Sequence, residues 1–351
     1  MAAHRPTLVV TMGDPAGIGP EIVVRALASA ALRRTAHLAV AGDPGVLARA
    51  ARRVRARLAF KILAPGDANL AAALRGSKGG IPLIASTEDG WAAIRPGSPT
   101  PASGRMAAKA IEAAAKAALD RHADGIVTAP ISKIALQAAG YPFPGHTEFL
   151  GSLARVPETR MLFVGKPYRI VLATVHLPLR KVSEALTVDS LTRTLEMAAA
   201  ALRNFRWGPR LAVAVLGLNP HAGEGGLFGD EEARVIEPAI QAAKARGIRA
   251  EGPYPADTFF SQHAKRRDLG IVVAMYHDQG LIPAKSGGIG GAANVTLGLP
   301  FVRSSVDHGT AFNRAWKSAS RAPDPSGLVT AIRVGADLAS RARRPMEWRW
   351  P

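Results

Sequence analysis

Short apolar runs alternate with alanine-rich helical stretches along most of this chain, and this alternation restricts the folds open to it. The apolar runs are short, continuous and rich in Val and Ile, as is typical of strands buried on both faces of a parallel sheet. The pattern predicts an α/β fold with a mainly parallel sheet. Strands are expected at residues 7–11, 37–41, 125–129, 170–175, 211–218 and 271–276, and helices at 20–31, 104–121, 191–204 and 231–246.

Length and composition narrow the class of protein further. With 351 residues, 48% of them hydrophobic, the chain can form two domains or one large α/β unit. It contains no cysteine, so disulfides, thiolate metal sites and iron–sulfur clusters are excluded, and any metal must be bound by His, Asp or Glu. Residues 1–6 lead into the first strand without a signal-peptide pattern, and no run approaches the roughly 20 apolar residues that span a bilayer. We therefore expect a soluble, cytoplasmic protein.

Three of the apolar runs lead into a histidine. These residues are His176, His221 and His277. Ligands of open α/β folds collect at the carboxyl ends of the strands. Three imidazoles at that edge can hold a divalent metal and leave one coordination position open, as catalytic sites do. A single histidine in such a place is more often a core or turn residue, so the metal-site hypothesis depends on all three histidines together. Their positions at strand ends also imply that one subunit supplies all three.

Other polar side chains stand in loops, where packing gives little reason for their type. His146 and Thr147 can donate hydrogen bonds to a phosphate or carboxylate; alternatively, Thr147 is a plain helix cap. Lys285, Asn294 and Arg303 offer two cations and an amide, which suits a phosphorylated acid; alternatively, they pair with surface carboxylates. The sequence thus predicts a site for an anionic metabolite.

Two further features have two interpretations each. Asp257 follows a Gly-Pro-Tyr-Pro loop and is either a general base or part of an Asx turn, with Asp278 as the second choice for the base.

The turn TMGDPAGIGPE, residues 11–21, lacks the spacing of dinucleotide and triphosphate loops. Its glycines either let backbone amides face an anion or allow a tight turn.

The chain is strongly basic, with 45 Lys and Arg residues against 27 Asp and Glu residues and a net charge of +18. The densest cluster is Arg49, Arg52, Arg53, Arg55 and Arg57. Nucleic-acid binding is one interpretation. Aromatic residues are only 5% of the chain and none is interleaved with the cluster, so we favour a solvated helix face. The positive field would also help to capture an anionic metabolite.

Several strings together resemble the 4-hydroxythreonine-4-phosphate dehydrogenase family (PdxA type) of pyridoxal phosphate biosynthesis. They follow the order of that family from residue 7 to residue 312. The resemblance implies an isocitrate/isopropylmalate dehydrogenase-like fold, with two α/β/α domains and the active site in the cleft between them. It implies domains at residues 1–140 with 299–351, and at 141–298. The strings are TMGDPAGIGPE, TAPISK, GHTEFL, VHLPLR, NPHAGEGGLFG, GPYPADT, YHDQGLIPAK and NVTLGLPFVRSSVDHGTAF.

The same resemblance implies an activity and a set of site residues. NAD or NADP would oxidise 4-phosphohydroxy-L-threonine to a 3-keto acid, which decarboxylates to 3-amino-2-oxopropyl phosphate. The enzyme would be a homodimer whose metal sites draw ligands from both subunits. One zinc, magnesium or cobalt ion per subunit would be bound by His176, His221 and His277. The substrate would be bound by His146, Thr147, Lys285, Asn294 and Arg303.

Relatives within the family act on 4-phosphoerythronate, 4-phosphothreonate or aromatic cis-dihydrodiols. The dihydrodiol branch departs from the His-Thr pair, so His146 and Thr147 favour a phosphorylated substrate. Two alternatives belong to other functional classes: a nucleic-acid-binding protein on a degenerate dehydrogenase fold, and a metal-dependent hydrolase.

The chain departs from the family pattern at residues 287–290, 292–293 and 313–327 without losing a matched ligand. It has no recognisable ribose-binding residue, so NAD and NADP stay as alternatives.

Overall fold

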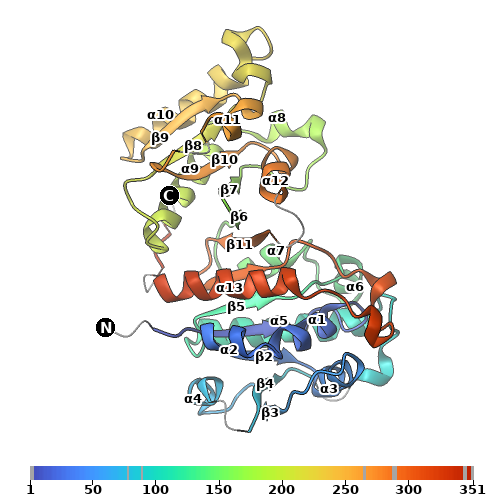
Figure 1. Cartoon of the computed structure of the whole chain (residues 1–351). Helices are drawn as coiled ribbons and strands as arrows, with labels where there is room; N and C mark the ends of the chain where they lie inside the picture. Colours follow the sequence, from blue (N-terminus) through green and yellow to red (C-terminus); the bar gives the residue numbers. More distant parts are fainter. Residues whose placement is uncertain are drawn as a thin grey trace. The chain divides into compact units, whose positions relative to one another are not determined.

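The computed structural model describes residues 4–76, 79–87, 90–263, 266–286, 291–342 and 346–348, and the chain divides into two compact units (Figure 1). The first unit comprises residues 1–157 and 299–340, and the second comprises residues 158–298 and 341–351. Both contain strands and helices in alternation, which confirms the α/β class. The glycine-rich departure at residues 287–290 lies outside the described residues.

The division into units agrees with the predicted one between residues 298 and 299 and differs from it at residues 141–157 and 341–351. Residues 141–157 belong to the first unit, because Phe149 and Leu150 are buried in its hydrophobic core. Residues 341–351 belong to the second unit. There the backbone carbonyl of Glu347 accepts a hydrogen bond from the Asn204 side chain at 2.9 Å.

The first unit contains a parallel sheet. Its described strands follow the order β3-β4-β2-β1-β5-β12, and each pairing is parallel. Parallel neighbours need crossover connections, which helices supply here. The strands are β1 (Thr7–Thr11), β2 (His37–Gly42), β3 (Phe60–Leu63), β4 (Ile81–Ala85), β5 (Gly125–Thr128) and β12 (Val302–Ser305). The helices are α1 (Gly19–Leu27), α2 (Ala30–Thr35), α3 (Pro44–Arg53), α4 (Leu70–Arg75), α5 (Pro101–Leu119), α6 (Lys133–Ala138), α7 (His146–Ala154) and α13 (Ser326–Arg341).

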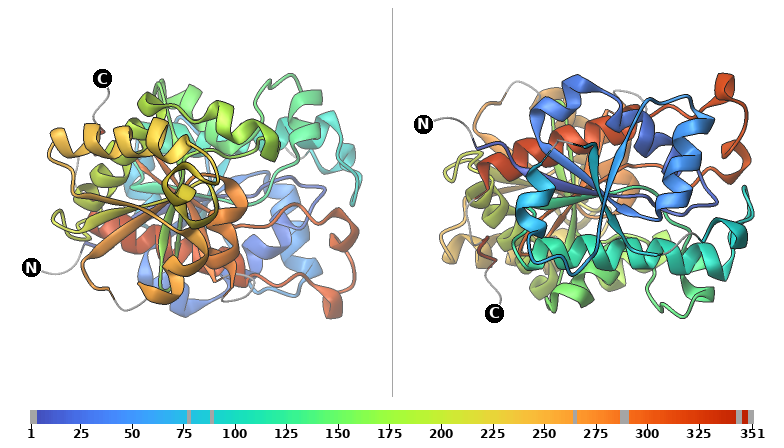
Figure 2. Two further views of the ribbon diagram at one scale, coloured as in Figure 1. Left: turned by 90° about the horizontal axis from the view of Figure 1, so that it is seen from above. Right: turned by 90° about the horizontal axis from the view of Figure 1, so that it is seen from below.

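Helices cover both faces of this sheet. In the right-hand view of Figure 2, α5 lies on one side of the strands and α1 and α13 lie on the other. Successive side chains of a strand alternate between the two faces. Val9 therefore packs in the core beneath α5, whereas Leu8 lies against Gly335 of α13. Burial on both faces explains why the strands are continuous apolar runs.

Local sequence determines where α5 begins and how closely it packs. Pro101 occupies the first turn, and Thr100 and Ser103 exchange side chain-to-backbone hydrogen bonds of 3.1 Å in a capping box. Gly104 follows, and a Cβ atom there would lie only 2.0 Å from the carbonyl oxygen of Ala135. The glycine therefore allows α5 and α6 to pack with their backbones in contact.

The second unit contains a mixed sheet. Its described strands follow the order β11-β6-β7-β10-β8-β9; the two pairings of β6 are antiparallel, and the others are parallel. The strand pairings are thus mainly parallel, as predicted; β6 is the exception, and a short turn joins it to β7 as a hairpin. The strands are β6 (Arg160–Gly165), β7 (Arg169–Leu172), β8 (Ala212–Leu216), β9 (Ala250–Tyr254), β10 (Leu269–Ala274) and β11 (Ala292–Leu297). The helices are α8 (Val182–Ala185), α9 (Val188–Asn204), α10 (Glu237–Ala245), α11 (Ala256–Gln262) and α12 (His277–Lys285).

The core of the second unit orients the helices that carry polar residues. Phe259 of α11 and Leu281 of α12 pack with Leu172, Leu216 and Ala274 on one face of the sheet. All six predicted strands and the four predicted helical stretches are found in the two units, with α1 ending earlier and the last stretch divided at Glu237. None of the helices in the described ranges has the length and apolarity needed to cross a membrane.

Candidate active site

A buried arginine and a half-buried histidine form the core of a candidate anion site in the first unit. Arg303 lies on β12, is 2% exposed, and donates a 2.7 Å hydrogen bond to the hydroxyl of Thr128 at the end of β5. His146 and Thr147 begin α7, directly after Gly145. No side chain caps the amino end of this helix. Free backbone amides and a favourable dipole at a helix start attract anions.

The electrostatics of this set favour a negatively charged ligand. Burial lowers the pKa of Arg303 to about 9, against the opposing effect of Glu148, so the guanidinium is still charged at neutral pH. Burial and the charge of Arg303 hold the pKa of His146 well below its usual range, so its ring is neutral. The Nε2 atom of His146 is buried and has no hydrogen-bond partner among the described residues. Such an atom is expensive to bury unless a ligand satisfies it.

Two of the predicted metal ligands lie together in the second unit. His176 follows β7 and His277 begins α12, and their ring centres are 5.8 Å apart. The Nδ1 atom of His277 hydrogen-bonds to the carboxylate of Asp278 at 2.7 Å. Because a carboxylate can only accept, this contact puts the proton on Nδ1 and leaves the lone pair of Nε2 for a ligand. Metal-binding histidines are commonly oriented in this way.

His221 does not join this pair within one chain. Its ring contacts Phe228, with the ring centres 5.9 Å apart, on an exposed turn. In the described part of the chain, no three His, Asp or Glu side chains are placed to hold a metal. The expectation from strand ends, that one subunit brings all three imidazoles together, therefore does not hold. The reason is local: His221, Ala222 and Glu224 adopt positive φ angles of 53°, 52° and 43°, and this backbone conformation sets the direction of the ring.

Two glutamates that the sequence analysis missed support this turn. Glu232 accepts hydrogen bonds from the backbone amides of Leu218 and Asn219, at 2.7 and 2.8 Å. The Asn219 side chain donates to Glu231 at 2.7 Å and to Glu232 at 2.9 Å. The hydroxyl of Ser183 also donates to Glu231, and these bonds lower the pKa of that carboxyl. The sequence signal that could have identified these two residues is the acidic run at residues 230–232, directly after NPHAGEGGLFG.

The remaining predicted site residues lie on three elements of the second unit. Lys285 ends α12 and is exposed. Asn294 lies on β11, and its side-chain oxygen is buried without a partner among the described residues. Asp257 is exposed in the first turn of α11. Since Asp278 is engaged with His277, Asp257 is the more available of the two predicted bases.

The glycine-rich turn between β1 and α1 has the features of a tight structural turn. Gly13 has a φ of 74°, and a Cβ atom there would lie 2.5 Å from the carbonyl oxygen of Pro130. Asp14 is fully buried and accepts hydrogen bonds from the Ala16 amide at 2.9 Å and the Ser103 hydroxyl at 3.4 Å. Burial raises the pKa of Asp14 to about 6.

The arginine cluster on α3 has neighbours that the sequence alone did not indicate. Distant parts of the chain bring two aromatic residues to it: Arg49 lies 4.8 Å from the ring centre of Trp91, which contacts Trp316. Arg53 donates 2.6 Å hydrogen bonds to the carbonyls of Trp316 and Lys317. Arg53 therefore anchors a loop of the first unit, while all five arginines of the cluster are exposed, as the interpretation as a solvated face expects.

Comparison with known proteins was made for the sequence and for the fold. The family described as "Pyridoxal phosphate biosynthetic protein PdxA" matches residues 34–335. The chain is 42% identical over 340 residues to a 4-hydroxythreonine-4-phosphate dehydrogenase from Geobacter metallireducens, with 97% of each chain covered. It is 38% identical over 334 residues to a D-threonate 4-phosphate dehydrogenase from Pectobacterium atrosepticum, with 95% of this chain and 99% of the relative covered. The crystal structure of a 4-hydroxythreonine-4-phosphate dehydrogenase from Klebsiella pneumoniae matches it with a TM-score of 0.85 at 37% identity, covering 97% of this chain and 100% of that one.

Proposed function

We propose, since this chain belongs to the PdxA family of pyridoxal phosphate biosynthetic proteins, that it oxidises 4-phosphohydroxy-L-threonine with NAD or NADP and a divalent metal ion. Membership makes the protein an oxidoreductase. We choose a phosphorylated substrate because buried Arg303 acts on His146, whose buried Nε2 atom has no hydrogen-bond partner among the described residues. A phosphate dianion fits both groups, because it accepts several hydrogen bonds and neutralises a buried cation.

The proposed phosphate contacts come from the first unit. Arg303 supplies the charge, and the neutral ring of His146 donates from Nε2. Thr147 and the free amides at the start of α7 supply further donors. We assign Lys285 and Asn294 to the carboxylate end of the substrate, because a cation and an amide suit that group.

The proposed metal ligands are His176 and His277 of one chain and His221 of a second copy. Imidazoles suit zinc or cobalt better than magnesium, which prefers oxygen ligands. Exposed apolar side chains follow each of the three histidines in the sequence. They support a homodimer whose interface lies beside these histidines. Their exposed fractions are 45% for Leu177, 74% for Leu227, 47% for Phe228 and 73% for Ile282. Scattered exposed apolar residues are ordinary, but a set of them beside functional residues suits a protein interface.

The proposed reaction removes a proton from the oxygen of the 3-hydroxyl group and a hydride from the carbon that carries this group. When bound, the metal lowers the pKa of this hydroxyl and stabilises the developing carbonyl. Asp257 accepts the hydroxyl proton, because Asp278 is held by His277. Bound NAD or NADP would supply the hydride acceptor, so that the alcohol would be oxidised as the nicotinamide is reduced. The resulting 3-keto acid loses carbon dioxide and leaves 3-amino-2-oxopropyl phosphate.

D-threonate 4-phosphate is a second candidate substrate, supported by the similarity to the Pectobacterium enzyme. It carries a hydroxyl where 4-phosphohydroxy-L-threonine carries an ammonium group.

The proposal is tested by measuring initial rates on four compounds. These are the two phosphorylated candidates, unphosphorylated 4-hydroxy-L-threonine and an aromatic cis-dihydrodiol. We expect kcat/KM for 4-phosphohydroxy-L-threonine to exceed that for the unphosphorylated compound about 100-fold, because the phosphate contacts are charged hydrogen bonds. A higher kcat/KM for D-threonate 4-phosphate selects the second candidate, and a preference for an unphosphorylated compound refutes both.

A further inference from the structure

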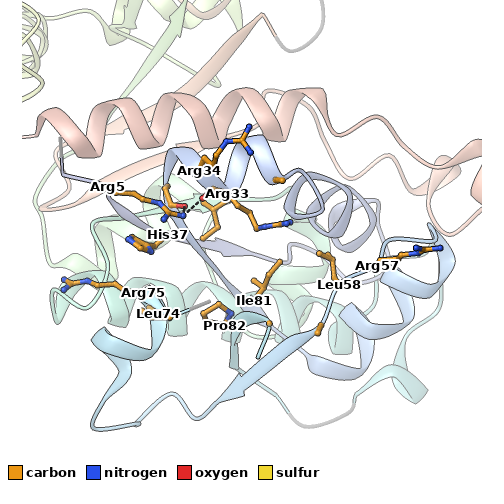
Figure 3. Close-up of a pocket in the computed structure, with 16 residues that line it drawn as sticks. Arg5, Arg33, Arg34, His37, Arg57, Leu58, Leu74, Arg75, Ile81 and Pro82 are labelled. Atoms are coloured by element: carbon orange, nitrogen blue, oxygen red, sulfur yellow. Dashed lines mark hydrogen bonds between the residues drawn. The ribbon is translucent and has the colours of Figure 1, made fainter. Parts of the chain in front are cut away.

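A cavity of about 440 Å³ lies at the amino ends of strands β1, β2, β3 and β4 (Figure 3). This is the opposite edge of the first-unit sheet from Thr128, which ends β5. The volume falls in the range of small-molecule sites. Six cationic or titratable side chains line it: Arg5, Arg33, Arg34, Arg57, Arg75 and His37.

The positive charge of this cavity is not balanced by acids. None of its sixteen lining residues is Asp or Glu. Among the ion pairs formed in the described ranges, none involves the five arginines. Asp124 influences His37, but its carboxylate already accepts from the Thr7 amide at 2.6 Å and contacts His4. Five like charges around one concavity repel each other, so an anion that enters relieves this repulsion.

Backbone contacts hold part of the cavity wall in place. The guanidinium of Arg5 donates to the carbonyls of Arg33 and Ala36, the second at 3.2 Å. The guanidinium of Arg33 donates to the carbonyl of Leu27. These arginines are therefore positioned before any ligand arrives. His37 lies in the same wall, and burial, followed by the charge of Arg5, lowers its pKa.

The arrangement of the side chains indicates the shape of the ligand. Figure 3 shows Arg5 beside His37, with Arg75 and Arg57 on opposite sides of the cavity. Cationic groups on opposite sides of a cavity of about 440 Å³ suit a chain of linked phosphates better than a single orthophosphate. No aromatic ring other than His37 lines the cavity, so it lacks the stacking surface typical of single-stranded nucleic acid sites. Leu38, Ile81 and Pro82 supply an apolar part of the wall.

We propose that this cavity binds a small molecule with two or more linked phosphates, such as a nucleoside polyphosphate or inorganic polyphosphate. The site is separate from the candidate active site and independent of the proposed function. Arginine is suited to it because its planar fork binds phosphate oxygens in pairs. Arg57 and Arg75 are the side chains to test, because both are exposed and neither forms a side-chain hydrogen bond or ion pair in the described structure.

Isothermal titration calorimetry with tripolyphosphate, ATP and orthophosphate, in buffer without divalent cations, tests this site. We expect tripolyphosphate to bind the full-length protein at least about tenfold more tightly than orthophosphate, and Arg57→Gln with Arg75→Gln to weaken it about 100-fold. The matched control is Arg95→Gln with Arg105→Gln, which removes the same charge from exposed positions of the same unit and should change affinity less than about twofold.

Each outcome decides the proposal. Equal affinities for ATP and tripolyphosphate identify the phosphate chain as the ligand, and tighter binding of ATP identifies a nucleotide; both support the site. Unchanged affinity in the Arg57/Arg75 variant overturns it, as does orthophosphate binding as tightly as tripolyphosphate. Loss of tripolyphosphate binding in Arg303→Met would move the binding to the candidate active site and also overturn it. Tighter, strongly salt-dependent binding of a single-stranded RNA would instead show a nucleic-acid surface.

Discussion

A heterodimer of one His221→Ala chain and one His277→Ala chain regains about half of the wild-type turnover, although each homodimeric variant loses about a thousandfold or more. The expectation follows from the separation of His221 from the His176–His277 pair within one chain. If the third ligand comes from the partner, one site of the heterodimer keeps all three imidazoles and the other site loses two. Two affinity tags isolate the heterodimer, and its turnover number is compared with that of wild type.

The matched control combines His176→Ala with His277→Ala. These two rings lie together in the same chain, 5.8 Å apart, so each site of that heterodimer lacks one ligand. We expect no recovery. Recovery in the control, or none with His221→Ala and His277→Ala, would show that the division of ligands between the copies is wrong.

Replacing Arg303 with Met lowers kcat/KM for the phosphorylated substrate about 100-fold without lowering the thermal unfolding midpoint. The buried guanidinium is proposed to bind phosphate, so its loss weakens binding of substrate and transition state alike. In the free protein the same cation is costly to bury, and Met is an apolar residue of similar length. Steady-state kinetics and thermal unfolding on the same preparation provide the two measurements.

Arg193→Met is the matched control for this substitution. Arg193 forms ion pairs with Glu158 and Asp189 on the second unit, away from the proposed ligands in sequence. We expect it to lose up to about 1 kcal/mol of stability and to keep its kcat/KM. If Arg303→Met instead unfolds the protein while the remaining folded fraction is fully active, Arg303 is a structural residue.

The sequence was sufficient for the α/β class and for most elements, because burial on both faces of a sheet leaves a continuous apolar run in the strand itself. Residues 7–11 and β1 coincide for that reason. The sequence also singled out Arg303 and His146 as candidate ligands, but as loop residues, whereas Arg303 lies on β12 and His146 begins α7. The hairpin of β6 and β7 was not predicted, because residues 160–165 were not among the expected strands.

Features made by distant residues could not be predicted in this way. The direction of the His221 ring depends on positive φ angles and on Glu231 and Glu232, which lie ten and eleven residues further on. Trp91 and Trp316 meet beside α3 only through the fold. The arginine-lined cavity at the amino ends of β1 to β4 combines segments from residue 5 to residue 82, and none of these segments alone indicates a cavity.

The most direct test of the central claim is the absorbance of reduced nicotinamide with enzyme stripped of metal by a chelator. The enzyme is mixed with 4-phosphohydroxy-L-threonine and NAD or NADP, first without and then with zinc or cobalt. We predict that the band of the reduced nicotinamide rises only after the metal is added, in step with release of carbon dioxide. Consumption of the substrate without reduction of the nicotinamide, or an undiminished rate without metal, would contradict the account.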